Sequence, residues 1–388
     1  MSKWEKVKLG DVIRINRISI QASHIEEDSY YIGLEDIEKD TGIILNNNKS
    51  GDSGIKSNKY TFTDQHILYG KLRPNLNKVA LPTKKGVCST DIFPISVQLD
   101  KSIKEFIYYI LKGKRFVSHA SSSTAGANLP RVNEKIINEY EIPLPPLEVQ
   151  KQIAQNLDTV SELLTLRKKQ FEELDRLIRS VFYDMFGDPV LNEKGWEVSS
   201  LHNKISIKHG FAFDGEYFSN SGLYVLLTPG NFYEEGGYRD RGEKQKYYLG
   251  EPKEDYILNR DDLLIAMTEQ AQGLLGSPLF VPESNKFLHN QRLGLIQVKN
   301  DELNKKYLFY LFNDFNVRKI IHLMATGIKV RHTSPSKIGE IVVAVPPLSL
   351  QNQFAIIVTK IEEQKSLVKQ SIKETQTLFD SLMSQYFN

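Results

Sequence analysis

The chain has 388 residues, 40% hydrophobic and 25% charged, which is typical of a globular protein and too long for one ordinary core, so we expect two domains. Its 50 basic and 48 acidic residues leave a formal net charge of only +2, which argues against a protein that simply coats nucleic acid. Cys88 is the only cysteine, which excludes an intramolecular disulfide. The sequence lacks both an apolar run of the ~18 residues that span a bilayer and an apolar signal-peptide core, so we expect a cytoplasmic protein without a membrane partner.

The first half of the chain has the pattern of an α+β globule. It opens with "WEKVKLGDVIRI" at 4–15 and continues in short β-rich segments separated by turn residues, such as "IGLEDI", "HILYGKL" and "VCSTDIFPISV". Apolar residues at helical spacing then predict a helix over 103–120, and "YEIPL" at 140–144 predicts a short strand. Pro145-Pro146 ends this strand and frees the chain to turn into the next helix.

A long helix is predicted after the proline pair. Residues 148–186 contain neither proline nor glycine, and a helix of this length would be a rod of roughly 58 Å. Its apolar residues alternate at gaps of four and three, the heptad pattern of a coiled coil, and only Arg167 interrupts them. Gly187-Asp188-Pro189 then ends the helix. The predicted seam consists of Ile153, Leu157, Val160, Leu164, Arg167, Phe171, Leu174, Ile178, Val181 and Met185.

The second half of the chain repeats the first. The opening recurs as "WEVSSLHNKISI" at 196–207, "KEFIYYIL" at 104–111 recurs as "KKYLFYLF" at 305–312, and "LPPLEVQKQIA" at 144–154 recurs as "VPPLSLQNQFA" at 345–355. The offset grows from 192 residues at the two tryptophans to 201 at the later matches. We therefore expect a tandem duplication with an insertion in the second half, which segment 233–248 would accommodate.

The second long helix carries the same seam, with Lys365 at the position of Arg167. Because a globule separates the two heptad helices, we expect them to pair antiparallel, with one globule at each end and an approximate internal two-fold axis. Two facing cations would repel, so each is expected to find a carboxylate, such as Glu162 or Glu363, or to extend into solvent. The predicted seam consists of Phe354, Val358, Ile361, Lys365, Val368, Ile372, Thr375, Phe379, Leu382 and Tyr386.

The predicted fold class is therefore α+β, with two tandem pseudo-symmetric α/β domains, each followed by a long helix, and the two helices pairing as an antiparallel coiled coil. We expect the domain boundaries to follow the proline pairs. The globules would span 1–146 and 188–347, and the long helices 147–187 and 348–388.

Motifs of catalytic sites are missing from the sequence. The Gly-Lys pair in "LYGKLRP" lacks the rest of a phosphate-binding loop, no Gly-x-Gly-x-x-Gly follows a strand, and no zinc-binding spacing occurs. Glu251 and Lys253 lack the upstream carboxylate of a nuclease site. We interpret Cys88 as a small core or loop residue and His289 as a polar surface or groove residue. These absences weaken an enzymatic interpretation without excluding it.

Two stretches carry basic residues with no intervening acid, one between Asp64 and Asp91 and the other between Asp314 and Glu340. Such a run is common on solvated surfaces, but its presence in both halves of a duplicated chain favours contacts with phosphate groups. The residues predicted to make these contacts are Lys71, Arg73, Lys78, Lys84 and Lys85 in the first half, and Arg318, Lys319, Lys329 and Arg331 in the second.

The duplicated Pro-Pro-Leu helix entrances, the Trp-Glu openings and the paired loops "STAGANLPRV" and "MATGIKVRHT" resemble the specificity subunits of type I restriction–modification systems. The resemblance covers essentially the whole chain. It implies that each globule is a target-recognition domain for one half of a bipartite, asymmetric site in double-stranded DNA. It also implies that the paired helices set the half-site spacing and dock two modification subunits, with restriction (translocase/endonuclease) subunits in the full complex. Adenine methylation with S-adenosylmethionine would then belong to the partner, leaving this chain without catalytic residues, cofactor or metal.

Base-edge contacts are expected from amide, guanidinium and imidazole side chains on loops, because these groups can distinguish bases in the major groove. The predicted base-contacting residues are Asn75, Asn77, Asn128 and Arg131 in the first half, and Gln270, Gln272, Asn290, Gln291, Arg292 and His332 in the second.

Two other functions remain open on sequence grounds. A coiled-coil scaffold whose globules bind proteins would explain the duplicated seam but not the paired basic runs. A nuclease or methyltransferase with an unrecognised site would need activity of the isolated chain with metal or S-adenosylmethionine. Steep loss of duplex DNA binding with added salt would distinguish a DNA-binding module from a scaffold.

Overall fold

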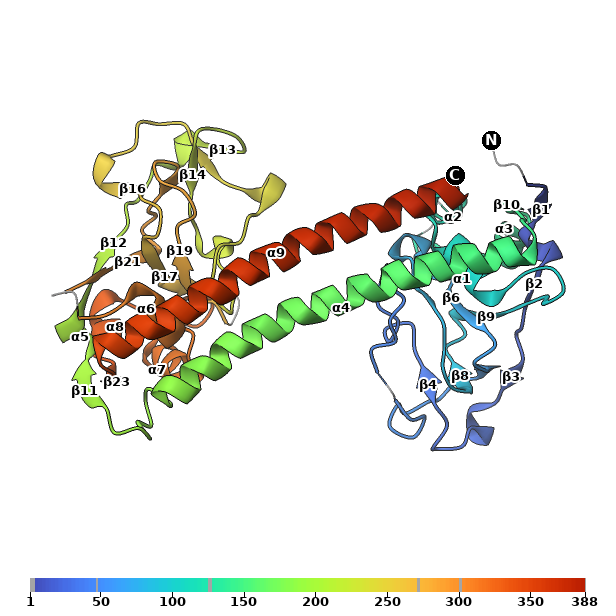
Figure 1. The fold of residues 1–388 in the computed structure, drawn as a ribbon, viewed down its shortest axis with the longest axis horizontal. Helices are drawn as coiled ribbons and strands as arrows, with labels where there is room; N and C mark the ends of the chain where they lie inside the picture. Colours follow the sequence, from blue (N-terminus) through green and yellow to red (C-terminus); the bar gives the residue numbers. More distant parts are fainter. Residues whose placement is uncertain (1–3, 47, 125–127, 271–272, 300–301, 388) are drawn as a thin grey trace. The chain divides into compact units, whose positions relative to one another are not determined.

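The computed structural model describes residues 4–46, 48–124, 128–270, 273–299 and 302–387. They form two compact units, which we call unit 1 (Met1–Lys168 with Gln370–Asn388) and unit 2 (Lys169–Lys369) (Figure 1). Each unit contains one globule and parts of both long helices. The unit boundaries therefore fall inside the helices, because each globule packs on the helix ends beside it. Among the described residues, no helix combines the length and hydropathy needed to cross a membrane.

Unit 1 contains the α+β globule predicted for the first half. Its first sheet has the order β2-β9-β6-β7 (Ile13–Ile15, Ile92–Val97, Ile67–Gly70, Val79–Ala80) and its second the order β3-β5-β8-β4 (Ser19–Ile20, Lys59–Phe62, Gly86–Cys88, Tyr31–Ile32). Strands β1 (Lys6–Lys8) and β10 (Glu141–Pro143) pair separately. The helix predicted over 103–120 is instead two helices, α1 (Lys104–Lys112) and α2 (Lys114–Ser122), because Gly113 takes an extended conformation (φ −61°, ψ 138°) between them. Helix α3 (Glu134–Asn138) precedes β10.

Unit 2 repeats this plan. The sheet β12-β21-β17-β19 (Ile205–His209, Leu293–Val298, Leu263–Ala266, Pro278–Phe280) has the same layout as β2-β9-β6-β7, and β11 (Glu197–Ser200) pairs with β23 (Val342–Val345) as β1 pairs with β10. The second sheet, β13-β15-β14-β20-β16 (Phe218–Ser219, Tyr247–Tyr248, Tyr224–Leu226, Phe287–Leu288, Ile257–Leu258), has one strand more than its counterpart. Strand β15 lies at the end of segment 233–248, where the sequence indicated an insertion. Helices α5 (Leu201–Lys204), α6 (Lys305–Phe312), α7 (Phe315–Met324) and α8 (Pro335–Gly339) complete the globule.

The long helices α4 (Leu147–Phe186) and α9 (Leu348–Phe387) have 40 residues each. In unit 1 the start of α4 lies beside the end of α9, where Asn156 Nδ2 donates to the Tyr386 hydroxyl at 3.0 Å. In unit 2 the end of α4 lies beside the start of α9, with the rings of Phe182 and Phe354 5.6 Å apart. The two helices therefore run antiparallel in each unit, which confirms the predicted fold class (Figure 1).

The buried layers of the helices follow the predicted seam closely. Ile153, Leu157, Phe354 and Val358 are almost completely buried, as the heptad pattern requires. Phe182 and Phe186 lie outside the predicted seam yet are equally buried, because both rings pack against Tyr307 of the globule. The helices thus serve two interfaces at their ends, one with the other helix and one with the globule.

The two seam cations have partners other than those predicted. Arg167 donates to the Ser371 carbonyl at 2.6 Å and to the Thr375 hydroxyl of the facing helix. Lys365 pairs with Asp175 and lies over the Phe171 ring at 5.0 Å. Lys365 confirms the expectation of a carboxylate partner, although the carboxylate is Asp175, whereas Arg167 contacts a carbonyl and a hydroxyl instead. Glu162 and Glu363 were the wrong candidates, because the antiparallel register places these other groups opposite each cation.

Replacing Arg167 by Leu is expected to raise the free energy of unfolding by about 1 kcal/mol, because it adds apolar contact at the seam. The Thr375 hydroxyl would remain satisfied, since it also donates to the Ser371 carbonyl at 2.7 Å. Urea denaturation of both proteins measures the difference. A destabilisation of similar size would show that the guanidinium contacts outweigh apolar burial.

Each proline pair is followed by a completely buried glutamine. Gln150 Nε2 donates to the carbonyls of Pro145 (2.8 Å) and Lys101 (3.0 Å), while its Oε1 accepts from the Ser102 hydroxyl (2.7 Å) and the Ile103 amide (3.2 Å). In unit 2, Gln351 donates to the Pro346 carbonyl (2.8 Å) and accepts from the Asn304 amide (2.9 Å). The repeated helix entrance is therefore a clamp that fastens the start of a long helix to the loop before α1 or α6.

Candidate nucleic-acid interface

Three loops of unit 1 meet at the end of strand β6. They are residues 71–78 after β6, residues 89–91 before β9 and residues 128–133 before α3. The Lys71 amide donates to the Asp91 carbonyl at 2.9 Å, and the Val132 amide donates to the Lys71 carbonyl at 2.9 Å. We call this arrangement the unit 1 loop junction. It brings together segments that are far apart in the sequence.

Unit 2 contains the same junction, built from residues 267–277, 289–292 and 325–334 as far as they are described. The Met267 amide donates to the Arg292 carbonyl at 3.0 Å, and the Thr333 amide donates to the Met267 carbonyl at 2.9 Å. The short strands β18 (Thr268–Glu269) and β22 (Arg331–His332) add a second link between two of these loops. The unit 2 loop junction thus keeps the backbone plan while its side chains differ.

A carboxylate lies among the cations of the unit 1 loop junction. Asp91 Oδ1 is 3.2 Å from Arg131 Nε and 3.9 Å from Lys71 Nζ, although the sequence between Asp64 and Asp91 contains no acid. The Lys71 ammonium also lies 5.0 Å from the centre of the Phe93 ring, and burial lowers the pKa of Lys71 despite the attraction of Asp91. The basic surface is therefore partly neutralised and held in a fixed geometry.

The unit 2 loop junction is organised around Glu269, whose side chain is 1% exposed. Its Oε2 accepts the amides of Gly273 and Leu275, both at 3.0 Å. Its Oε1 lies 3.4 Å from His322 Nδ1 and 3.8 Å from Arg331 Nη1. One buried carboxylate therefore holds the turn of one loop and the cation of another.

The predicted contact residues of unit 1 divide into two groups. Lys78 Nζ donates to the Leu34 carbonyl at 2.7 Å, and Asn77 Nδ2 donates to the Lys112 carbonyl at 3.1 Å, so these side chains are engaged within the protein. Lys71 is half-buried beside Asp91. The residues with exposed side chains are Arg73, Asn75, Lys84, Lys85, Asn128 and Arg131. Lys84 and Lys85 lie in the turn before β8, outside the loop junction.

The predicted residues of unit 2 divide in the same way. Arg318 donates to the Glu234 carbonyl at 3.2 Å and to the Gly273 carbonyl, and burial lowers its pKa to about 10, so it braces the loop junction from inside. Asn290 Oδ1 accepts the Arg292 amide at 3.1 Å and shapes the turn, while Arg331 donates to the His322 carbonyl. Gln272 lies outside the described residues. Exposed side chains belong to Gln270, Gln291, Arg292, Lys319, Lys329 and His332.

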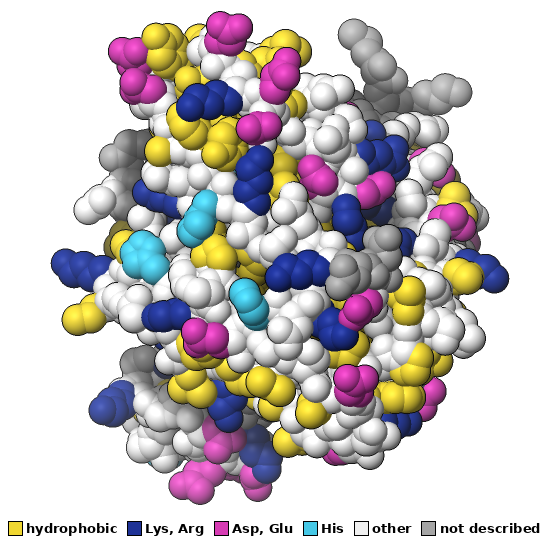
Figure 2. Space-filling view, turned by 90° about the vertical axis from the view of Figure 1, so that its left-hand side faces the viewer, with side chains coloured by type: hydrophobic (Ala, Val, Ile, Leu, Met, Phe, Trp, Pro, Cys, Tyr) yellow, Lys and Arg dark blue, Asp and Glu magenta, His cyan; other side chains and the backbone are white. Residues whose placement is uncertain are grey.

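Figure 2 shows that Lys and Arg side chains are interspersed with Asp and Glu on the face it draws, with histidines near the centre. A surface of this kind has no large field of one sign.

The prediction for Cys88 was correct, whereas the prediction for His289 was wrong. His289 is 0% exposed and Nε2 lies 3.0 Å from the Leu293 carbonyl oxygen, so its interpretation as a surface or groove residue was wrong. It directly precedes the turn 290–292 of the unit 2 loop junction, and its ring lies 6.3 Å from that of Tyr256. Cys88 is also 0% exposed, and burial raises the pKa of its thiol, which confirms its interpretation as a core residue.

His289 makes the stability of unit 2 dependent on pH. Burial, together with Lys208 and His209, lowers its pKa from 6.5 to about 4, so the folded protein keeps it neutral where the unfolded chain binds a proton. Its contribution to stability is therefore present above pH 6.5 and lost as the pH falls toward 4. Against a His289→Gln variant, we expect the wild-type protein to lose about 3 kcal/mol more of unfolding free energy between these values. Denaturation curves of both proteins at several pH values test this; parallel pH profiles would contradict it.

Sequence reasoning missed Asp91 and Glu269, the two carboxylates that organise the loop junctions. Each follows or precedes a buried strand, β9 after Asp91 and β17 before Glu269, and that position was the available signal. A search for basic runs along the chain passes over them, because the cations they meet come from other loops.

The duplicated fold with one loop junction per unit defines a protein with two related polar loop surfaces. A model of the family described as type I restriction modification DNA specificity domain matches residues 1–176 and 193–376. The chain therefore belongs to the family of type I restriction–modification DNA-specificity proteins, which confirms the resemblance seen in its sequence.

Individual relatives match different shares of the chain. The MjaVIII specificity subunit of Methanocaldococcus jannaschii is 25% identical over 373 residues, covering 91% of this chain and 84% of that protein. The EcoDI specificity subunit of Escherichia coli is 31% identical over 119 residues, covering 31% of this chain and 26% of that protein.

Two solved structures share the fold. A chain from a study of assembly and conformational transition of the type I R-M system has a TM-score of 0.60 at 17% identity, covering 99% of this chain and 97% of that chain. The S subunit of a type I system from M. genitalium has a TM-score of 0.60 at 16% identity, covering 100% of this chain and 96% of that chain. At these identities, the likeness shows the fold alone.

Proposed function

We propose that each unit reads one half of a bipartite site in double-stranded DNA through its loop junction. The observation that carries this proposal is the repeated junction, in which one backbone plan presents Arg73, Asn75 and Asn128 in unit 1 and different polar side chains in unit 2. Because the two junctions share a backbone arrangement but carry different side chains, they would recognise different base sequences, so the full site would be asymmetric.

Within each junction, the exposed polar side chains would contact base edges. In unit 2 these are Gln270, Gln291, Arg292 and His332. The side chains already engaged within the protein, such as Lys78 and Arg318, would position the loops. Phosphate contacts are assigned to the exposed lysines Lys84, Lys85, Lys319 and Lys329, whose side chains carry charge at the surface.

The long helices would set the separation of the half-sites and dock two modification subunits. Family membership and the continuity of α4 and α9 from one unit into the other support this role. In this proposal the chain is non-catalytic and cytoplasmic. The modification subunits carry S-adenosylmethionine and methylate an adenine in each half-site, and restriction subunits complete the complex.

Reconstitution tests the proposal directly. Purified modification subunits with this chain should methylate one split DNA sequence, and neither component alone should do so. Modification of the same sequence without this chain would overturn the proposal. Replacing residues 1–146 by the equivalent segment of another family member should then change one half of the methylated sequence and leave the other intact.

Salt dependence separates DNA reading from protein scaffolding. A protein that neutralises several phosphates should lose duplex DNA affinity roughly 10³-fold or more between 50 and 200 mM salt. Binding that is weak and independent of salt would favour a scaffold whose globules bind proteins.

A further inference from the structure

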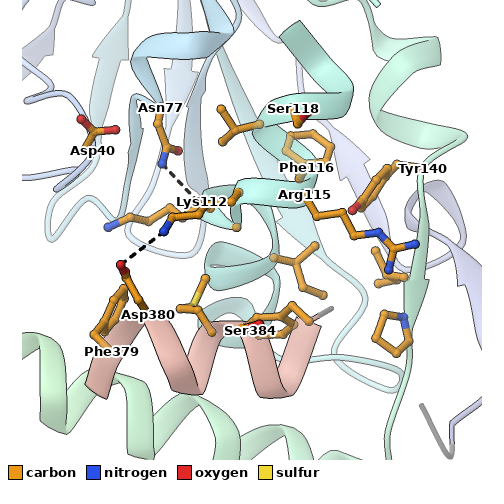
Figure 3. A pocket seen from close by; sticks show the side chains of 18 of the residues that line it. Asp40, Asn77, Lys112, Arg115, Phe116, Ser118, Tyr140, Phe379, Asp380 and Ser384 are labelled. Atoms are coloured by element: carbon orange, nitrogen blue, oxygen red, sulfur yellow. Dashed lines mark hydrogen bonds and ion pairs between the residues drawn. The ribbon is translucent and has the colours of Figure 1, made fainter. Parts of the chain in front are cut away.

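Unit 1 contains a largely apolar cavity of about 640 Å³ beside the end of helix α9. Its walls come from α2, β10 and the last turns of α9 (Figure 3). On one side of the cavity, Arg115 extends from α2 toward Tyr140. Phe379 and Ser384 belong to the wall that α9 forms. The cavity shares Asn77 with the loop junction and Phe379 with the helix seam, while most of its lining belongs to neither.

The equivalent place in unit 2 is filled by the chain itself. There the segment after α4 folds back on the globule, and Asn316 Nδ2 donates to Asp188 Oδ2 at 2.5 Å. The Ala344 amide of β23 donates to the Pro189 carbonyl at 2.8 Å, and Pro189 is buried. Val190 packs against the core of the unit. An acidic residue, a proline and an aliphatic residue thus occupy this site in order.

The 201-residue offset of the repeat maps this site onto the cavity of unit 1. Asn316, which holds Asp188, corresponds to Arg115, and Ala344, which holds Pro189, corresponds to Pro143. Phe186, the last residue of α4, corresponds to Phe387. Arg115, Pro143 and Phe387 all line the cavity.

The unit 1 site is also larger because two of its residues have smaller side chains than their counterparts in unit 2. In unit 2 the Tyr183 hydroxyl donates to Asp314 Oδ2 at 2.7 Å, and these two side chains close the space between α4 and α7. Their counterparts are Ser384 and Gly113, which both line the cavity. The unit 1 site therefore has room for one bulky apolar side chain beyond an Asp-Pro-Val segment.

The cavity lining is balanced in charge, with Asp40, Glu141 and Asp380 beside Lys112, Lys114 and Arg115, so an acidic ligand needs a cation that is not already paired. Lys114 pairs with Asp380 at 3.2 Å, and Lys112 donates to the Tyr108 hydroxyl at 3.0 Å, so both lysines are engaged. Arg115 has no ion pair with the residues that the structure describes. Asn77 Oδ1, also in the lining, is buried without a hydrogen-bond partner among those residues.

We propose that this cavity is a docking site for an extended segment of a partner protein, in which an acidic residue is followed by proline and a bulky apolar residue. Arg115 binds the acidic side chain, as Asn316 binds Asp188. The proline lies over Pro143, whose lack of an amide hydrogen removes one bond present in unit 2. The apolar residue enters the space beside Ser384, and a ligand donor can satisfy Asn77 Oδ1.

The test uses a fluorescent peptide with the sequence of residues 187–196, GDPVLNEKGW, and the full chain, with binding measured by anisotropy. The unit 2 site is already occupied by this segment, so only the unit 1 cavity is expected to bind the peptide, and with one-to-one stoichiometry. Arg115→Glu should weaken binding at least tenfold, and a peptide with Lys in place of Asp should recover affinity for this variant. That recovery cannot come from a folding defect.

Two further variants complete the test. Ser384→Tyr restores the side chain found in unit 2 and should weaken binding by filling the cavity, whereas Lys56→Glu changes an exposed charge outside the lining and should leave binding unchanged. Absence of binding at about 1 mM peptide, or equal binding by all variants, overturns the proposal. Light scattering that shows a dimer of this chain, lost in Arg115→Glu, would assign the surface to a second copy and also overturn it.

Discussion

Replacing Gln150 by Leu is expected to lower the free energy of unfolding by about 3 kcal/mol, because four buried polar groups lose their partner. The side chain is completely buried, and its amide satisfies two carbonyls, one hydroxyl and one backbone amide at 2.7–3.2 Å. Leucine has a similar size but can satisfy none of them. Chemical denaturation followed by circular dichroism measures the loss.

Gln152 supplies the matched control, because it is the same residue type two positions along the same helix with an exposed side chain. Among the described residues, its side-chain amide donates only to Asn156 Oδ1, at 2.9 Å. Gln152→Leu should change stability by about 0.5 kcal/mol or less. Equal losses for the two variants would show that the clamp contributes nothing beyond helix formation.

Replacing Glu269 by Leu is expected to destabilise unit 2 by about 3 kcal/mol, because two backbone amides lose their buried acceptor and Arg331 loses its ion pair. The amides are those of Gly273 and Leu275, and Arg331 Nη1 lies 3.8 Å from Glu269 Oε1. If unit 2 reads DNA as proposed, loosening these loops should also reduce sequence-specific binding more than non-specific binding. Denaturation and competition binding with random duplex DNA measure the two effects.

Two variants separate charge from shape in this prediction. Glu269→Gln keeps an amide oxygen as acceptor and should lose less stability than Glu269→Leu. Glu283→Leu removes an exposed carboxylate that pairs only with Lys286, at 2.6 Å, and should change neither property measurably. Wild-type stability and DNA discrimination in Glu269→Leu would exclude the carboxylate as the organiser of the loop junction.

The features that could be predicted from sequence are those with a local physical cause. A heptad seam is a regular spacing of apolar residues, and a proline pair restricts its own backbone, so both can be recognised without knowing the tertiary contacts. The duplication could be recognised because the two halves repeat these local patterns at a nearly fixed offset. Even here the seam was incomplete at Phe182 and Phe186, which pack against both Phe354 of the partner helix and Tyr307 of the globule.

The partners of polar side chains could not be predicted in the same way. Basic runs without an intervening acid suggested free cations, yet Asp91 and Glu269 reach those cations from other loops. Arg318 and Lys78 were predicted to contact phosphate groups because they are basic, but both donate to backbone carbonyls of the protein. Hydrogen-bond partners depend on which loops the sheets bring together, and loop order along the chain does not determine that.

By itself, the sequence determined the duplicated α+β plan, the two long helices and the family, because apolar spacing, prolines and repeats act within short segments. Only the tertiary structure decided that Gln150 and Gln351 clamp the helices, that three loops meet in each unit and that the cavity beside Arg115 is open where its counterpart is filled. These features arise from contacts between residues distant in the chain. Their geometry follows from the packing of whole sheets and helices, which no local pattern encodes.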